Sequence, residues 1–244
     1  MFEFLVFNCY ICVYKQIKID NMKKITLLVG VVFASLIGTA QTISTFPYNE
    51  NFEGMTTGTA LGNGWTNSTT DNLDWTVDAN GTTSSNTGPT SSTGGTINAP
   101  DHNPGTIGGQ YVYVETSGGA GNGTNIADLV SPYFDMTALT NAKFSFWYHA
   151  YGATMGDLDV EARIGSQGVW ANILGTITDD VNLWQKGELC LGATYAGNDS
   201  VQFRFSYRVG NGFGGDMAID DISISPINPI DVGVTAISAA GGCG

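Results

Sequence analysis

Apolar and polar residues alternate with a period of two in several short segments between Phe46 and Ile224, and no segment there keeps a helical period. The clearest alternation runs through 201–209, where five apolar residues share one face. A period of two is typical of a strand that is buried on one face. The expected strands are 111–114, 128–130, 144–148, 158–164, 201–209 and 217–224. Glycine-rich turns such as 118–121 and 210–212 separate them, so the pattern predicts an all-β antiparallel sandwich or barrel.

Residues 54–108 depart from this alternation. They are rich in Gly, Thr, Ser and Asn, and Trp65 and Trp75 are their main apolar residues. A structureless connection of that length is unusual inside a compact domain. We therefore expect long loops with a few short strands, fixed to the core by the two tryptophans.

The first 40 residues are expected to be a targeting segment. A basic start at Met22 is followed by an apolar run and by a small-residue cleavage site at 38–40, which predicts a signal peptide at 22–40. The alternative, a membrane anchor, is disfavoured because the apolar run of about 14 residues is shorter than the roughly 20 that a bilayer requires. Residues 1–21 precede this signal, and we interpret them as a misassigned upstream start.

The folded domain is expected at 46–225. Pro226 and Pro229 mark a linker after it, and alternation resumes at 231–237. Residues 226–244 are therefore predicted to hold a linker and the start of a further, truncated domain, and the sequence resembles the front part of a longer protein.

The charge balance is strongly acidic. The chain has 22 acidic and 9 basic residues, a net charge of −13, and charged residues make up only 13% of it. Without residues 1–40 the balance is 20 acidic against 5 basic residues, a net charge of −15. No basic surface is then available to neutralise phosphates, which argues against nucleic acid and anionic lipid as partners. Cations such as calcium remain compatible with this charge.

Cysteine content indicates neither a disulfide scaffold nor a zinc site. Cys9 and Cys12 fall in the upstream segment, so the exported chain keeps Cys190 and Cys243. Two cysteines are too few for either kind of framework. A Cys190–Cys243 bridge is left open, and core packing is expected to hold the domain together.

Several ordered motifs resemble those of MAM domains. The domain opens with Asn51-Phe52-Glu53, closes with Gly215 to Ile222, and carries Asp101-His102 between them. The other matching segments are 74–75, 87–89, 109–116, 127–132, 144–152 and 155–158. The resemblance implies a concanavalin-like jelly-roll sandwich of two antiparallel sheets. It departs from animal receptors at Lys143, where they carry a cysteine, and in extra Ser/Thr/Gly sequence after Pro89, which suggests a bacterial-type member without the paired cysteines.

The resemblance also implies a function. We expect a non-catalytic adhesion or recognition module of a secreted or surface protein, with an extracellular protein, a glycan or a second copy as its partner. The alternative is a carbohydrate-binding accessory module of a larger secreted enzyme, such as a peptidase or a glycoside hydrolase. The sequence contains no nucleophile elbow, zinc-protease helix or phosphate-binding loop, so no catalytic residue is predicted.

Acidic residues at the two ends of the domain form the candidate metal site. In a jelly roll the first and last strands are commonly neighbours, so Glu53 could meet Asp220 and Asp221, with Asp74 and Asp101 joining from the long loops. Such a set predicts a structural calcium or sodium ion, since calcium takes six to eight oxygen ligands. The alternative is that these acids cap turns or face solvent. Alternation places Asp220 on the apolar face of Ala218, Ile222 and Ile224, where an unpaired carboxylate would cost several kcal/mol.

Aromatic and histidine residues provide the remaining candidates. Trp170 and Trp184 flank the turn-rich stretch 165–183, and we predict that they contact a ligand such as a sugar. Trp75 and Trp147 are expected in the core. His149 and His102 are expected to be structural, with His149 packed and hydrogen-bonded.

Overall fold

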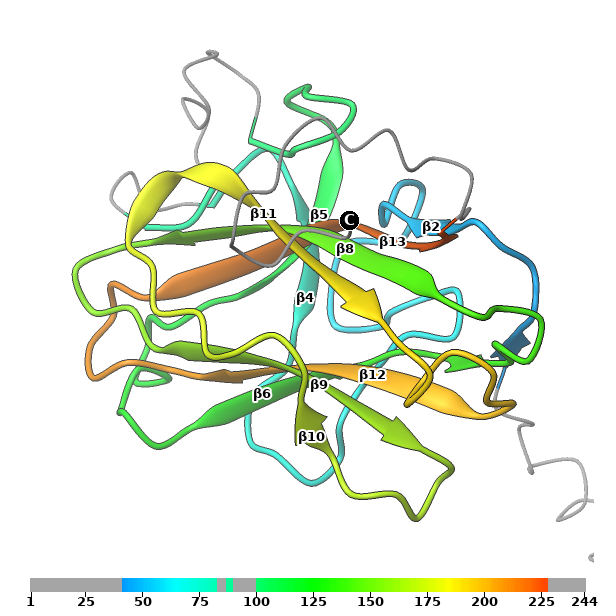
Figure 1. The fold of residues 1–244 in the computed structure, drawn as a ribbon. Coiled ribbons are helices and arrows are strands. Elements are labelled where there is room, and N and C mark those ends of the chain that lie inside the picture. Colours follow the sequence, from blue (N-terminus) through cyan, green and yellow to red (C-terminus); the bar gives the residue numbers. More distant parts are fainter. Residues whose placement is uncertain (1–40, 83–86, 90–99, 228–244) are drawn as a thin grey trace, which may run out of the picture. The chain divides into compact units, whose positions relative to one another are not determined.

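The computed structural model describes residues 41–82, 87–89 and 100–227, and every regular element among them is a β-strand. The strands form two facing sheets, seen nearly edge-on in Figure 1. Their bounds are β1 Thr42–Ile43, β2 Tyr48–Glu50, β3 Thr66–Asn67, β4 Thr76–Ala79, β5 Gln110–Val114, β6 Ile126–Val130, β7 Tyr133–Phe134, β8 Ala142–Tyr151, β9 Asp157–Ile164, β10 Ala171–Asn172, β11 Val181–Leu191, β12 Val201–Arg208 and β13 Asp216–Pro226. The described part of the chain contains no helix that could span a membrane.

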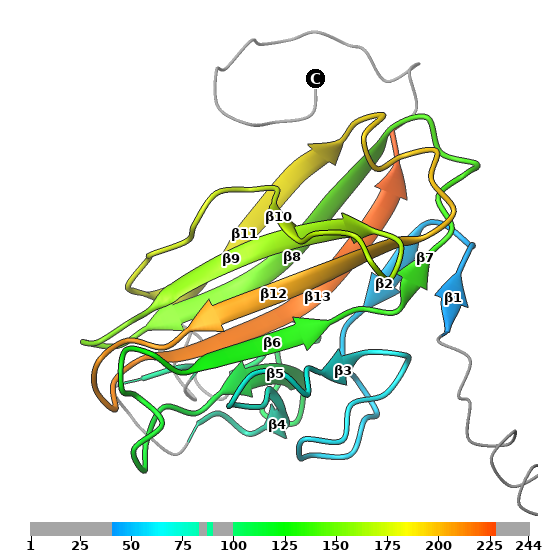
Figure 2. The same cartoon turned by 90° about the horizontal axis from the view of Figure 1, so that it is seen from below.

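The two sheets have different strand orders. The seven-stranded sheet runs β1-β7-β12-β6-β3, with β9 on the other side of β12 and β10 beyond β9. The six-stranded sheet runs β11-β8-β13-β5-β4, with β2 also beside β13. All strand pairs are antiparallel except β1 with β7. In Figure 2 the two sheets overlap, and the long strands of both run in nearly the same direction. The predicted all-β sandwich of two antiparallel sheets is confirmed.

Aromatic side chains from both sheets fill the space between them. Phe144 and Phe146 of β8 face inward, and their ring centroids lie 4.6 Å from Phe203 and 4.9 Å from Phe205 of β12 respectively. All four are fully buried. The alternation that predicted these strands thus reflects one face turned to a shared core, where each aromatic side chain removes a large apolar area from water.

Trp65 and Trp75 fix the long loops, as expected. The indole Nε1 of Trp65 donates to Tyr48 Oη at 2.8 Å, and that of Trp75 donates to the Ala127 carbonyl at 3.0 Å. Both rings are buried. In the described residues of these loops, 54–82, 87–89 and 100–108, the strands are the short β3 and β4. Trp147 differs from the expectation: it is half-buried on the outer face of its sheet.

A β-bulge in β13 reverses the alternation. The prediction that Asp220 shares one face with Ala218, Ile222 and Ile224 therefore holds for Ala218 and is wrong for the two isoleucines. Asp220 pairs with Trp147, but the next paired residue, Ser223, lies opposite Ser145, so β13 advances one residue more than β8. Asp221 has a φ of 47° at this point. Because of the extra residue, Asp220 points away from the core while the two isoleucines point into it.

Other predictions fall on residues outside the described part. The upstream segment 1–21, the signal peptide 22–40 and nearly all of the linker segment 226–244 are among them. Cys190 is disulfide-bonded, and Cys9, Cys12 and Cys243 all lie outside the described residues.

Candidate metal centre

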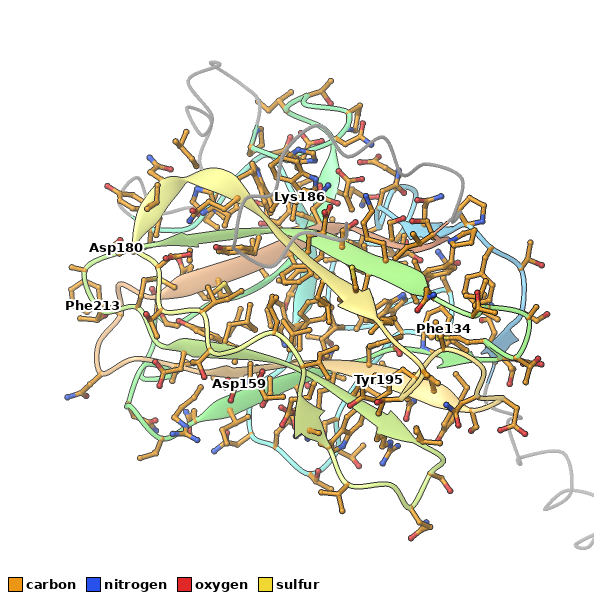
Figure 3. The ribbon with its side chains drawn as sticks, viewed as in Figure 1. Phe134, Asp159, Asp180, Lys186, Tyr195 and Phe213 are labelled. Carbon is orange, nitrogen blue, oxygen red and sulfur yellow. The ribbon has the colours of Figure 1, made fainter. Side chains whose placement is uncertain are left out.

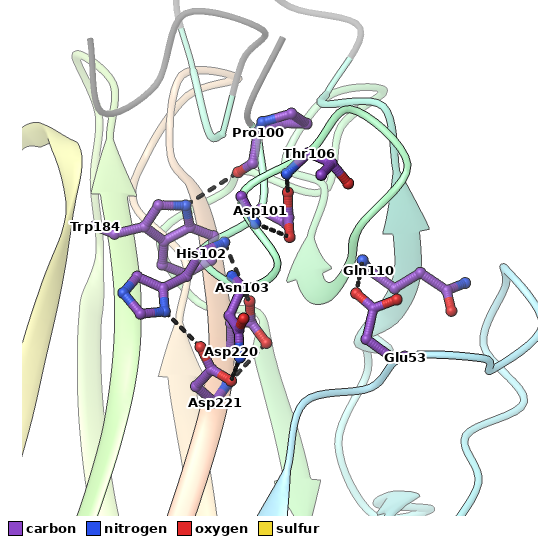
Figure 4. Close-up of polar contacts among 11 residues, drawn as sticks. Glu53, Pro100, Asp101, His102, Asn103, Thr106, Gln110, Trp184, Asp220 and Asp221 are labelled. Carbon is purple, nitrogen blue, oxygen red and sulfur yellow. Dashed lines mark hydrogen bonds and ion pairs between the residues drawn. The ribbon is translucent and has the colours of Figure 1, made fainter. Parts of the chain in front are cut away.

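The bulge in β13 presents Asp220 to the segment 100–109, which precedes β5 and passes over the outer face of the six-stranded sheet (Figure 4). Asp220 Oδ2 accepts the backbone N–H groups of His102 at 3.2 Å and Asn103 at 3.4 Å. Its Oδ1 accepts the N–H of Asp221 at 2.7 Å. The carboxylate is completely buried. Asp220 therefore ties the loop to the strand through backbone groups.

Asp221 holds the same loop through side chains. Its Oδ2 pairs with Nδ1 of His102, and its Oδ1 accepts Nδ2 of Asn103 at 3.2 Å. The His102 ring stacks on Trp147 with centroids 3.8 Å apart. One ligand atom from each of His102, Asp220 and Asp221 lies within 4.8 Å of the others. We call these three residues the acidic cluster.

Burial dominates the electrostatics of the cluster. Desolvation, and after it the charge of Asp221, raises the pKa of Asp220 to about 9, although three backbone N–H groups act in the opposite direction. A bound cation would stabilise the charged form of both carboxylates. Their oxygens fit calcium or sodium, whereas the imidazole of His102 is not a ligand that calcium prefers. Two of the three donors thus fit the predicted ion.

Asp101 is buried but turned toward its own loop. Its Oδ2 and Oδ1 accept the N–H groups of Gly105 at 3.0 Å and Thr106 at 2.8 Å. The neighbouring backbone packs closely, since a Cβ on Gly109 would lie 1.9 Å from Asp101 Oδ2. Asp101 therefore closes the loop that carries His102.

The other two predicted ligands lie apart from the cluster. Glu53 Oε1 accepts the N–H of Gln110 at 2.7 Å, at the start of β5 (Figure 4). Asp74 is exposed, and its charge acts on Asp71, whose carboxylate binds the Asp128 amide in the other sheet. Of the five predicted ligands, the structure brings together Asp220 and Asp221.

The third member, His102, was expected to be only structural. The sequence signal for His102 was its position next to Asp101, a predicted ligand, in the Asp101-His102 motif.

The two predicted ligand-binding tryptophans lie on different sheets. Trp184 in β11 donates from Nε1 to the Pro100 carbonyl at 3.0 Å (Figure 4), and its ring meets those of His102, Tyr111 and His149 edge-on. Trp170, before β10, lies on the seven-stranded sheet. There the guanidinium carbons of Arg163 and Arg204 are 4.4 and 4.7 Å from its ring centroid. Trp184 thus belongs to the surroundings of the acidic cluster, and Trp170 to a separate surface.

The family model of the MAM domain (meprin/A5/mu) matches residues 51–228. The chain belongs to the MAM domain family. It is 32% identical over 171 residues to MAM domain-containing glycosylphosphatidylinositol anchor protein 1 of Rattus norvegicus, a match covering 66% of this chain and 16% of that protein. It is 30% identical over 152 residues to neuropilin-1a of Danio rerio, and this match covers 62% of this chain and 15% of that protein. The chain thus spans about a sixth of the length of these relatives.

A solved structure has a similar fold. The K1 cleaved adhesin domain of Lys-gingipain from Porphyromonas gingivalis W83 superposes with a TM-score of 0.51 at 19% identity, and the match covers 75% of this chain and all of that one. At this identity the likeness concerns the fold alone.

Within this MAM domain three of the family motifs converge on the acidic cluster. The closing motif contains the bulge of β13, and the Asp101-His102 motif supplies the loop that covers it. The aromatic motif of β8 contributes Trp147, which stacks on His102, and His149. His149 is packed and hydrogen-bonded, as predicted: it is fully buried and its Nε2 pairs with Asn182 Oδ1 at 3.1 Å. Burial lowers its pKa to about 4.

Proposed function

We propose that this MAM domain is a non-catalytic recognition module of a secreted or cell-surface protein. The observation that carries the proposal is that the ionisable groups around the acidic cluster have partners within the chain. Asp101 and Asp220 accept backbone N–H groups, and His102 pairs with Asp221. In the described part of the chain these contacts hold a loop on the sheet, which is the role that we assign to these groups. Two of the relatives are named glycosylphosphatidylinositol anchor proteins, which supports an extracellular location for this domain.

We also propose that calcium, or alternatively sodium, binds at Asp220 and Asp221 in a structural role. The support is a fully buried carboxylate next to a second one, with a pKa raised to about 9. A cation would offset both the desolvation of Asp220 and its repulsion by Asp221. Because the same residues anchor the 100–109 segment, the ion would stabilise that loop.

Chelation is expected to lower the melting temperature of the full chain, and added calcium to restore it. An ion present at 100 times its Kd stabilises by about 2.7 kcal/mol, or about 5 to 10 °C for a domain of this size. Differential scanning calorimetry in EDTA and then in excess calcium measures the shift, and sodium in place of calcium distinguishes the two ions. Asp221→Asn should abolish the response, whereas Asp74→Asn, at an exposed site away from the cluster, should keep it. An unchanged melting temperature in EDTA contradicts calcium, and one that is also unchanged in sodium-free buffer contradicts any ion.

The second candidate function, carbohydrate binding, is favoured by the setting of Trp170. The two guanidinium groups beneath its ring are held in place: Arg163 Nη2 donates to Gln202 Oε1 at 2.6 Å, and Arg204 Nη1 donates to Asp128 Oδ2 at 2.8 Å. The indole is only half-buried. A flat, supported aromatic ring beside hydrogen-bonding side chains suits stacking against the apolar face of a sugar.

On a glycan array, Trp170→Ala is expected to reduce sugar binding about tenfold or more, the loss typical of a central contact residue. Trp184→Ala serves as the matched variant. Because Trp184 holds Pro100 and the rings around it, its replacement should lower the melting temperature more than the affinity. Sugar binding that is retained in Trp170→Ala, or absent from the wild-type chain, would rule out this second function.

A further inference from the structure

Phe213 is an exposed aromatic residue in the turn between β12 and β13. It is 79% exposed and does not belong to the core cluster. Figure 3 shows its ring projecting from one end of the sandwich, the same end as Asp180. Its neighbours in the turn are Gly210, Asn211, Gly212, Gly214 and Gly215. A solvent-exposed phenylalanine among glycines would ordinarily indicate a mobile loop.

Hydrogen bonds to two other loops fix this turn. On one side, Gly212 N–H donates to the Gly121 carbonyl and Gly123 N–H donates to the Gly210 carbonyl, each at 3.0 Å. On the other side, Gly214 N–H donates to Thr154 Oγ1 at 3.0 Å, and Thr154 N–H donates to the Gly214 carbonyl at 2.7 Å. Backbone groups on both sides of Phe213 are therefore held.

Close packing adds to these bonds. A Cβ on Gly121 would lie 1.7 Å from the Gly212 carbonyl oxygen, and one on Gly210 would lie 2.0 Å from the Thr154 carbonyl oxygen. Side chains are excluded at these positions because backbone meets backbone. Glycine at these positions therefore allows the backbones of neighbouring loops to pack against each other.

Tyr207 secures the base of the turn from inside. Its fully buried hydroxyl donates to the Gly215 carbonyl and accepts Gly156 N–H at 3.1 Å. The turn is thereby tied to the core strand β12 as well as to its neighbouring loops.

We infer that Phe213 is the anchor of a protein-docking surface and inserts into an apolar pocket of an extracellular partner protein. The inference rests on the recognition function proposed above and deepens it. A rigid turn has little backbone freedom left to lose on binding. Buried aromatic anchors contribute a large share of the binding energy in protein interfaces. An aromatic ring held out in water on a fixed backbone combines these two properties.

The charges around Phe213 indicate the kind of partner. Asp180 binds Gly152 N–H at 2.9 Å, and Gly152 packs against the Gly214 carbonyl. Asp157 follows Gly156, which packs against the backbone of the turn. Glu115 precedes Thr116, and Thr116 Oγ1 accepts the N–H of Gly215 in the turn. Among the described residues, Arg208 contributes a basic side chain at this end, opposite Asp157. Such an acidic rim favours a partner with basic residues around its pocket, and it disfavours anionic lipid and a second copy of this chain.

An array of purified extracellular protein domains, probed with the full chain, tests the inference. Phe213→Ala is expected to weaken binding to a captured domain about 30-fold or more, and Phe213→Trp to retain it. Val169→Ala is the matched control, because Val169 is 88% exposed on a different loop. All three variants should keep the wild-type melting temperature, because neither side chain is buried. Higher salt should weaken binding if the rim charges contribute.

The outcomes separate this inference from the function on which it rests. Protein binding that Phe213→Ala leaves unchanged, or binding only to a glycan array, overturns the docking surface and leaves recognition in place. Binding only to phosphatidylcholine vesicles, or dimerisation in sedimentation, also overturns it. No binding to any protein or glycan contradicts both. Hydrogen exchange gives an independent check: rapid exchange at Gly212 and Gly214 amides would refute the rigid display.

Discussion

Replacing Arg204 with methionine is expected to destabilise the domain by about 2 to 4 kcal/mol. The guanidinium joins two largely buried carboxylates on the seven-stranded sheet. Its Nε donates to Glu161 Oε2 at 2.6 Å, and its Nη1 donates to Asp128 Oδ2 at 2.8 Å. The other oxygen of Asp128, Oδ1, is buried without a hydrogen-bond partner. Removing Arg204 leaves two poorly solvated negative charges facing each other, and it takes away half of the support beneath Trp170.

Urea unfolding at pH 7 measures this loss. Arg208→Met is the control, since Arg208 is an exposed arginine of the same strand, and its replacement should change stability by less than about 0.5 kcal/mol. Adding Glu161→Gln to Arg204→Met should recover part of the stability, because one unpaired charge is removed. A loss below about 0.5 kcal/mol for Arg204→Met would mean that solvent already screens the two carboxylates.

Acidification is expected to destabilise the domain through His149 as the pH falls from about 6.5 to about 4. The folded-state pKa of this buried imidazole is lowered to about 4 from an ordinary value of 6.5. In this pH window the unfolded chain binds a proton that the folded chain excludes, so the free energy of unfolding decreases with falling pH. The contribution is complete above pH 6.5 and amounts to about 3 kcal/mol at most.

Unfolding free energies of wild type and His149→Gln, measured between pH 4 and pH 7.5, isolate this contribution. Glutamine does not titrate, so the variant should lack the part of the acid dependence that belongs to His149, while the carboxylates contribute equally to both curves. As the pH falls, the free energy of unfolding of wild type should decrease more than that of His149→Gln. Parallel curves across this window would show that His149 takes up a proton in the folded state without cost.

The alternation of side chains carried enough information to predict the long strands except β11, Val181–Leu191, which was not among the expected strands. In β8 and β12 every second residue is apolar and buried, because both strands turn one face to the same core. The two-residue strands β1, β3, β7 and β10 gave no such signal, since two residues cannot show a period. The bulge in β13 was missed for a related reason. Aspartate tolerates positive φ better than most residues, but nothing in a pair of aspartates marks where a strand gains a residue.

The candidate site was predicted in part. Asp220, Asp221 and Trp184 were proposed from separate motifs, and the segment 100–109 joins them through His102 and Pro100. His102 lies more than a hundred positions from Asp220 and Asp221 in the sequence. No local pattern encodes contacts over such a separation. Asp101 illustrates the opposite case: its partners are amides four and five residues later, the kind of local capping contact that short acidic side chains commonly make.

The bulge at Asp221 also bears on how this domain can change over time. On one side β13 keeps a single neighbour, β8, but on the other its neighbour changes from β5, which pairs up to Ile219, to β2, which pairs from Ile222 onward. Because of the extra residue, the inward-facing positions before and after the bulge follow different alternations along the same strand. Losing the extra residue would force Ile222 and Ile224 toward water and bring polar residues inward, so lineages carrying this fold should keep the length of this strand.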